Sequence, residues 1–150
     1  MSEIVPSPAP GGVGAEPVAL VKSFTFAGGA GTGLSGSAII FFTVTGEVEI
    51  ISLVPICDTD LTTSGAATLA LGVTGNTTLF IAATTATTID AALFWMTATP
   101  TANALAIPAA LKNIAITDNI LGTVATANIT GGVIRFQLLW RPLSAGSLVV

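Results

Sequence analysis

Apolar side chains dominate the stretch from Ala38 to Ile56, and the pattern predicts two strands joined by a turn at Thr45-Gly46. Successive side chains of a strand point to opposite faces, so a two-residue turn assigns every residue of this hairpin to one face. The first face would form the core of a single domain, with Ile39, Phe41, Thr43, Val48, Ile50 and Ser52. The second face would carry Ala38, Ile40, Phe42, Val44, Glu47, Glu49, Ile51 and Leu53.

The second face of this predicted hairpin is too apolar to remain in water. Leaving its large side chains exposed would forgo about 1.5–3 kcal/mol of burial for each of them. A soluble chain seldom keeps such a patch uncovered, so we expect another layer or subunit to lie on it. The expected interface residues are Ile40, Phe42, Ile51 and Leu53. The contact would stop near the turn, where Glu47 and Glu49 lie.

Short apolar or alternating stretches recur along the rest of the chain, separated by turn residues. We expect strands at 18–26, 92–96 and 133–140, and hairpins of 67–73 with 79–83 and of 111–117 with 120–126. The last strand places Ile134, Phe136, Leu138 and Trp140 on one face. Two prolines interrupt 97–110, which we expect to be a long loop with at most one helical turn. The pattern predicts an all-β fold, either an antiparallel β-sandwich or a jelly roll.

The first 17 residues differ from the rest of the chain. They contain four prolines and little that a core would bury, so we expect an extended Pro/Gly-rich arm over 1–17 and a single β-sandwich domain over 18–150. The arm would lie on a neighbouring subunit or across its own domain. In the first case its contact residues would include Pro6, Pro8 and Pro10.

Charged residues are scarce, at 8% of the chain against 51% hydrophobic residues. No charge occurs between Leu61 and Ile89, whereas about a quarter of the residues of an ordinary soluble domain are charged. So little charge indicates that much of the surface is buried against protein, as in an obligate oligomer or a shell. The net charge is −4 and the four basic residues are scattered, which excludes nucleic acid as a partner.

No apolar run reaches the length of a membrane-spanning helix, so we expect no membrane contact. The first residues lack the basic and apolar regions of a signal peptide, and we expect synthesis in a cytoplasm. Cys57 is the only cysteine, which excludes an intrachain disulfide. With no histidine to activate its thiol and Asp58 beside it, Cys57 is expected to be a buried small apolar residue.

Candidate catalytic chemistry is weak, and we expect no catalytic, cofactor-binding or metal-binding residue. The Glu47 and Glu49 pair would sit at a hairpin tip, where carboxylates usually serve to keep an edge solvated. Asp58 and Asp60 would need Asp90 or Asp118 to approach before they could hold Ca²⁺, and no binding-loop spacing supports this.

The glycines at 31–36 and the two tryptophans could each have either a structural or a ligand-binding role. Gly31, Gly33 and Gly36 spell a dinucleotide-binding pattern, but a β-branched strand follows them where that motif requires a helix. Trp95 and Trp140 could stack on sugars. Trp140 alternates with core residues and is expected to be buried, whereas the pattern around Trp95 decides less.

From Phe42 onward, several short phrases resemble small structural proteins encoded by tailed bacteriophages. The phrases are FTVTGEVEI (42–50), CDTDLT (57–62), ATLALGVTGNT (67–77), FIAATTATTIDA (80–91), TVATANITGGVI (123–134) and LWRPLS (139–144). The resemblance implies a virion component of the phage head. It carries over no functional residue.

These observations predict a non-enzymatic capsid decoration, or cement, subunit on the surface of a phage head. Its partners would be itself, as a homotrimer, and the major capsid protein. Two alternatives remain open at this point. One is a receptor- or carbohydrate-binding module of a tail or head fibre that uses loops around Trp95, and the other is a tail or connector ring protein.

Overall fold

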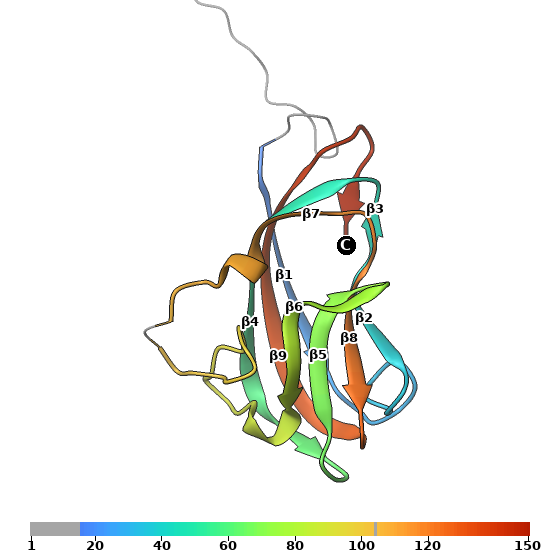
Figure 1. Cartoon of the computed structure of the whole chain (residues 1–150), viewed down its shortest axis with the longest axis vertical. Coiled ribbons are helices and arrows are strands. Elements are labelled where there is room, and N and C mark those ends of the chain that lie inside the picture. The colour runs from blue at the N-terminus through green and yellow to red at the C-terminus, as the bar shows by residue number, and fades with distance from the viewer. Residues whose placement is uncertain (1–15, 104) are drawn as a thin grey trace, which may run out of the picture.

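The described part of the chain, residues 16–103 and 105–150 of a computed structural model, is built almost entirely of β-strands (Figure 1). The strands are β1 (Val18–Thr25), β2 (Ala38–Phe42), β3 (Val44–Thr45), β4 (Val48–Thr63), β5 (Thr68–Val73), β6 (Asn76–Thr85), β7 (Lys112–Ile116), β8 (Ile120–Ala125), β9 (Ile129–Pro142) and β10 (Leu148–Val149). Most of the predicted arm, residues 1–15 with Pro6, Pro8 and Pro10, lies outside the described residues.

Two four-stranded antiparallel sheets pack face to face, which confirms the predicted all-β sandwich. Sheet I has the strand order β1-β9-β4-β7, and sheet II has the order β2-β8-β5-β6. Apart from the short strands β3 and β10, the pairs β1–β9, β2–β8, β4–β7 and β5–β6 join the first strand to the last, the second to the next-to-last, and so on inward. Such a ribbon, folded so that β9 meets β4 and β8 meets β5, has the connectivity of a jelly roll.

The hairpin predicted over 38–56 does not form. β2 pairs with β8 in sheet II, whereas β4 pairs with β9 and β7 in sheet I. Gly46, at a φ of +73°, turns the chain from one sheet toward the other, a conformation that glycine adopts at little cost. The short strand β3, just before this turn, pairs with the C-terminal strand β10. The two apolar runs therefore face each other across the core and are not hydrogen-bonded neighbours.

Two β-bulges also change which residues face the core. Ile40 and Phe42 pair with consecutive residues of β8, so Phe41 is an extra residue in β2. Ile50 and Ser52 likewise pair with consecutive residues of β9, so β4 has an extra residue at Ile51. Since a bulge breaks the alternation of faces, a register counted from the turn fails beyond it.

The remaining strand predictions have mixed outcomes. The first strand, the hairpin of β5 with β6 and the long strand over 133–140 are confirmed. The hairpin predicted around Asp118-Asn119 is wrong, because β7 belongs to sheet I and β8 to sheet II. The strand predicted at 92–96 is reduced to a single bridging residue, Phe94, which pairs with Ile56 and with Thr101.

The core lies between the sheets and contains the apolar residues of both inner faces. Ile134, Phe136, Leu138 and Trp140 of β9 are all buried, as their alternation predicts. The ring centroids of Phe41 and Phe136 lie 4.5 Å apart across the two sheets. Gly122 in β8 leaves room for Phe41, since a Cβ there would come within 2.6 Å of the ring.

The connection between β6 and β7 crosses from sheet II to sheet I and forms a lobe beside β4 (Figure 1). It includes two 3₁₀ turns, η1 (Ala86–Thr88) and η2 (Ala109–Leu111), and between them the loop expected over 97–110. The glycine pattern at 31–36 leads into strand β2, as expected from the sequence. In the described ranges, no helix is long and apolar enough to cross a membrane.

Candidate functional site: an uncharged sheet face

Sheet II has an outer face without charge. None of its strands, β2, β8, β5 and β6, contains an aspartate, glutamate, lysine or arginine. The strands of sheet I contain Lys22, Glu49, Asp58, Asp60, Lys112, Arg135 and Arg141. The outer face of an antiparallel sheet is normally polar where it meets water. The two faces of this sandwich are therefore chemically different.

The outer face of sheet II carries mostly small side chains. Ile39, Gly122 and Leu71 pair in one row and are buried, so the neighbouring rows point outward. One outward row runs through Ala38, Thr123 and Ala70, and the next includes Ile40 and Leu121. We refer to the outward residues as the uncharged face: Ala38, Ile40, Thr68, Ala70, Leu121, Thr123 and Ala125, of which Ala70 and Leu121 are already buried within the chain, at 5% and 8% exposure.

Ile40 is the most exposed large apolar residue of this face, with 54% of its surface accessible. It lies on the edge strand β2, which contains no charged residue and no proline to discourage pairing with another strand. The other residues of the uncharged face could not be assigned to it from the sequence. The charge-free stretch 61–89 was visible, but its union with β2 and β8 depends on the strand order.

The outer face of sheet I is instead bounded by charge at both ends. The Arg135 guanidinium lies 3.1 Å from a carboxylate oxygen of Asp58, and Arg141 pairs with Glu49. Between them is a shallow hollow of about 160 Å³ that is lined mainly by aliphatic residues of β1, β4 and β9. Both ion pairs lie at the surface, where such pairs usually contribute at most about 1 kcal/mol to stability.

The structure separates the four predicted interface residues of the domain. Ile40 is exposed on sheet II, and Ile51 is half-buried in β4 of sheet I. Phe42 and Leu53 are wholly buried in the core, so the prediction that they form an outer face is wrong. The reason is the pair of bulges, which turn Phe42 and Leu53 inward.

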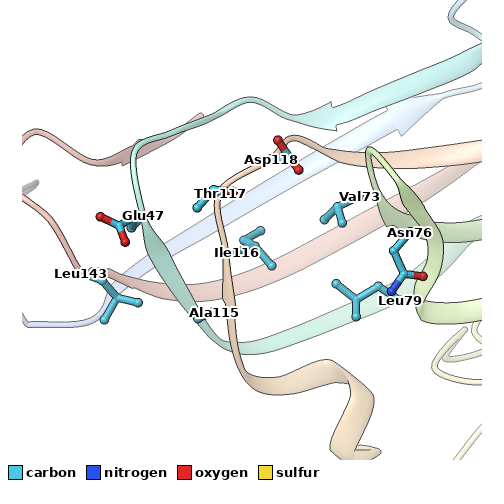
Figure 2. Close-up of a pocket in the computed structure, with 9 residues that line it drawn as sticks. All are labelled: Glu47, Val73, Asn76, Leu79, Ala115, Ile116, Thr117, Asp118 and Leu143. Atoms are coloured by element: carbon cyan, nitrogen blue, oxygen red, sulfur yellow. The ribbon is translucent and has the colours of Figure 1, made fainter.

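A cavity of about 280 Å³ opens at one end of the sandwich, and we call it the end cavity. Figure 2 shows Glu47 and Leu143 on one side of β7, and Val73, Asn76 and Leu79 on the other. Ala115, Ile116, Thr117 and Asp118 complete the lining. No local sequence pattern marks this cavity, because its residues come from β5, β6 and β7 and from the connections that follow β3, β7 and β9.

The Cys57 side chain is buried in β4, as expected from the sequence. Burial raises the pKa of its thiol to about 11, and the nearby Asp60 carboxylate acts in the same direction. The Cys57 Sγ lies 3.0 Å from the carbonyl oxygen of Thr59, to which it donates a hydrogen bond. A thiol that holds its proton so firmly is a poor nucleophile at neutral pH.

The candidate metal ligands do not gather. Asp58 is paired with Arg135, and an Asp60 carboxylate oxygen accepts a hydrogen bond of 2.6 Å from the Ala91 amide. Among residues 16–103 and 105–150, no three histidine, cysteine, aspartate or glutamate side chains are placed to hold an ion.

Trp95 and Trp140 are both core residues. Trp140 is buried, as the alternation of β9 predicts. Trp95 is wholly buried too, and its indole Nε1 donates a hydrogen bond of 2.9 Å to Thr84 Oγ1. A sugar cannot stack on a ring that protein atoms cover on every side. The alternative in which Trp95 forms a carbohydrate-binding loop therefore loses its key residue.

Comparisons with known proteins identified no relative of this chain. No family model, no curated protein and no solved structure matches the chain. The surface of the molecule and the short phrases quoted above are therefore the basis for a proposed function.

Proposed function

We propose that this protein is a non-enzymatic structural subunit that works through protein–protein contacts, as a capsid decoration or cement protein of a tailed-phage head. The observation that carries the proposal is the uncharged face of sheet II. It stands in contrast to sheet I, whose strands carry all the strand charges of the described residues.

The uncharged face has the properties of a surface that is covered in use. Permanent interfaces are apolar and depleted of charge, like a domain core cut in half. Packed sheets usually lie about 10 Å apart, and the small alanine and threonine side chains of this face would allow a second layer to approach that closely. Ile40, the most exposed large apolar side chain of the face, would leave water in such a contact.

The assignment to a phage head has two supports. The jelly-roll strand order is used by viral capsid domains, although it is also used by lectins and cannot decide a function alone. The phrases at 42–50, 67–77 and 139–144 resemble phage structural proteins. Under this proposal the protein lies on the outer surface of the virion as a homotrimer bound to the major capsid protein. The arm, with Pro6, Pro8 and Pro10, extends over a neighbour.

A matched pair of substitutions tests the assembly surface. Ile40 and Val21 are both exposed, at 54% and 61%, and each lies on an edge strand, of sheet II and sheet I respectively. We expect Ile40→Lys to convert the wild-type oligomer to monomer, since it buries an unpaired charge in the contact. Val21→Lys should leave the mass unchanged. Light scattering after size exclusion measures both, and a wild-type monomer or equal effects would contradict the assembly surface.

A second experiment tests whether the protein binds to phage heads. Purified protein is added to phage heads that lack it, and bound protein is quantified after sedimentation. We expect wild type and Val21→Lys to bind at a fixed stoichiometry and to raise the temperature at which the heads release DNA. Failure of the wild-type oligomer to bind would overturn the head assignment while leaving the assembly surface intact.

A further inference from the structure

The end cavity is a second feature of the surface with defined chemistry, and its interpretation does not rest on the proposed function. Its volume of about 280 Å³ lies just below the range of small-molecule sites, roughly 300–1,000 Å³. This size suits one long side chain or a compact ligand. The floor is aliphatic, since Val73 and Ile116 are 8% and 7% exposed and Leu79 is half-buried beside them.

Two carboxylates stand at the cavity, those of Glu47 and Asp118. Within the described residues neither forms an ion pair, whereas Glu49 and Asp58 are each paired with an arginine of this chain. No lysine or arginine lines the cavity. The remaining polar groups are Asn76 and Thr117, so the lining has negative charge with nothing positive to balance it.

The segments that bear these carboxylates are held in place by hydrogen bonds. The Glu47 amide donates to Ser144 Oγ at 3.2 Å, and the Glu47 carbonyl accepts from the Leu143 amide at 2.8 Å. Next to Asp118, the Asn119 side-chain oxygen accepts from the Val44 amide at 2.8 Å. The cavity is therefore formed before any ligand arrives, which lowers the entropic cost of binding.

An aliphatic floor with acidic groups beside it selects a particular ligand chemistry. A bare metal ion would leave the aliphatic floor unused, and three clustered ligand side chains are not found in the described part of the chain. A neutral apolar ligand would leave the carboxylates without a partner. Lysine and arginine combine an aliphatic stem, which covers apolar surface, with a charged head that pairs with carboxylates.

We propose that the end cavity binds a single lysine or arginine side chain presented by an extended segment of a partner protein. The stem would lie on Val73, Leu79 and Ile116, and the charged head would reach Asp118, while Glu47 on the other side of β7 adds to the negative potential of the cavity. Charge complementarity and cavity size both favour this occupant over a larger or an anionic ligand.

Peptide titration of the full-length, isotope-labelled protein by NMR tests the proposal. The probes are acetyl-Gly-Lys-Gly-amide, its arginine analogue, and a norleucine analogue that keeps the stem without the charge. We expect the basic peptides to shift the amide signals of 73–79 and 115–118, with affinity that falls as salt rises. The norleucine peptide should bind about ten-fold more weakly or not at all.

Matched variants test whether the carboxylates of the end cavity are needed for peptide binding. Glu47→Gln with Asp118→Asn keeps the shape and removes both charges, and it should weaken binding of the lysine peptide about ten-fold or more. Asp90→Asn removes an exposed carboxylate that does not line the cavity and should leave binding unchanged. The proposal is overturned by equal binding of norleucine, by unchanged binding to the double variant, or by the absence of shifts at the cavity. Displacement of the peptide by millimolar Ca²⁺ would also overturn it, since the site would then be a cation site.

Discussion

Trp95 shows how one hydrogen bond fixes the environment of a residue that its local sequence leaves open. Its ring is wholly buried, and its Nε1–H is satisfied by Thr84 Oγ1 at the far end of β6. Thr84 is itself buried, and its hydroxyl also lies 2.9 Å from the Ala82 carbonyl, to which it donates. This buried pair anchors the long connection between β6 and β7 to the core.

Thr84→Val keeps the shape of the side chain and removes the hydroxyl. We expect it to lower the free energy of unfolding by about 1–3 kcal/mol, because the indole N–H of Trp95 is then buried without a partner. Urea unfolding followed by tryptophan fluorescence measures the change. Thr85→Val, at the exposed neighbouring position, should change stability by less than about 0.5 kcal/mol. Equal effects of the two variants would show that the bond contributes nothing.

The buried thiol of Cys57 makes the stability of the protein decrease at alkaline pH. In the native protein its pKa is raised to about 11, whereas an unfolded cysteine titrates near 8.5. Above about pH 8.5 the unfolded chain loses the thiol proton and the native chain keeps it, so stability falls as pH rises. The slope should approach about 1.4 kcal/mol per pH unit before it levels off near pH 11.

Comparison with Cys57→Ala isolates this effect. We expect the two stability curves to run parallel below about pH 8 and to converge at higher pH, as wild type loses its thiol contribution. Chemical denaturation at several pH values gives the curves. Curves that stay parallel up to pH 11 would mean that the native thiol titrates like the unfolded one.

Local breaks in regularity decide the inner faces of the strands. The bulge at Phe41 leaves both Phe41 and Phe42 in the core, and the bulge at Ile51 puts Leu53 on the same inner face as Ile50. Gly122 has a complementary role, because its missing side chain is the space that the Phe41 ring occupies. A bulge on one strand and a glycine on the next thus accommodate a single aromatic ring.

Gly122→Ala should therefore destabilise the protein through overpacking. The new methyl group would lie 2.6 Å from the Phe41 ring, and we expect a loss of about 1–3 kcal/mol. Gly29→Ala is a suitable control, since its Cβ would meet only the Thr32 hydroxyl at 3.2 Å. Thermal unfolding of both variants measures the difference, and a Gly122→Ala protein as stable as the control would show that the ring moves aside freely.

Charge is distributed unevenly over the whole molecule. The strand charges of the described residues all lie in sheet I, and the face of sheet II offers only small and aliphatic groups. A contact through this face would depend on apolar burial, which salts do not screen, whereas paired charges are screened within about 10 Å at 0.1 M salt.

Assembly through the uncharged face should accordingly resist salt. We expect the oligomer mass to stay constant from about 0.05 to 1 M NaCl, and sulfate to strengthen association because it favours apolar burial. Sedimentation velocity across this range makes the measurement, with Ile40→Lys as the non-assembling control. Dissociation by NaCl would point to the ion-paired surface of sheet I.

The fold class, the alternation of β9 and the scarcity of charge could be predicted from the amino-acid sequence alone. These properties depend on the residues of one strand or on simple composition. The tertiary structure decided the partners of each strand. Apart from β5 and β6, strands that follow each other along the main ribbon lie in opposite sheets, so sequence proximity predicted two hairpins that do not exist.

The uncharged face and the end cavity illustrate the same division. Sequence showed an apolar run around Ile40 and charge-free stretches, but only the strand order joins β2, β8, β5 and β6 into one face. Glu47 and Asp118 are far apart in the sequence but line one cavity, because Glu47 precedes β4, Asp118 follows β7 and these two strands pair. Long-range pairing sets these juxtapositions through the packing of the whole core, and no local pattern records it.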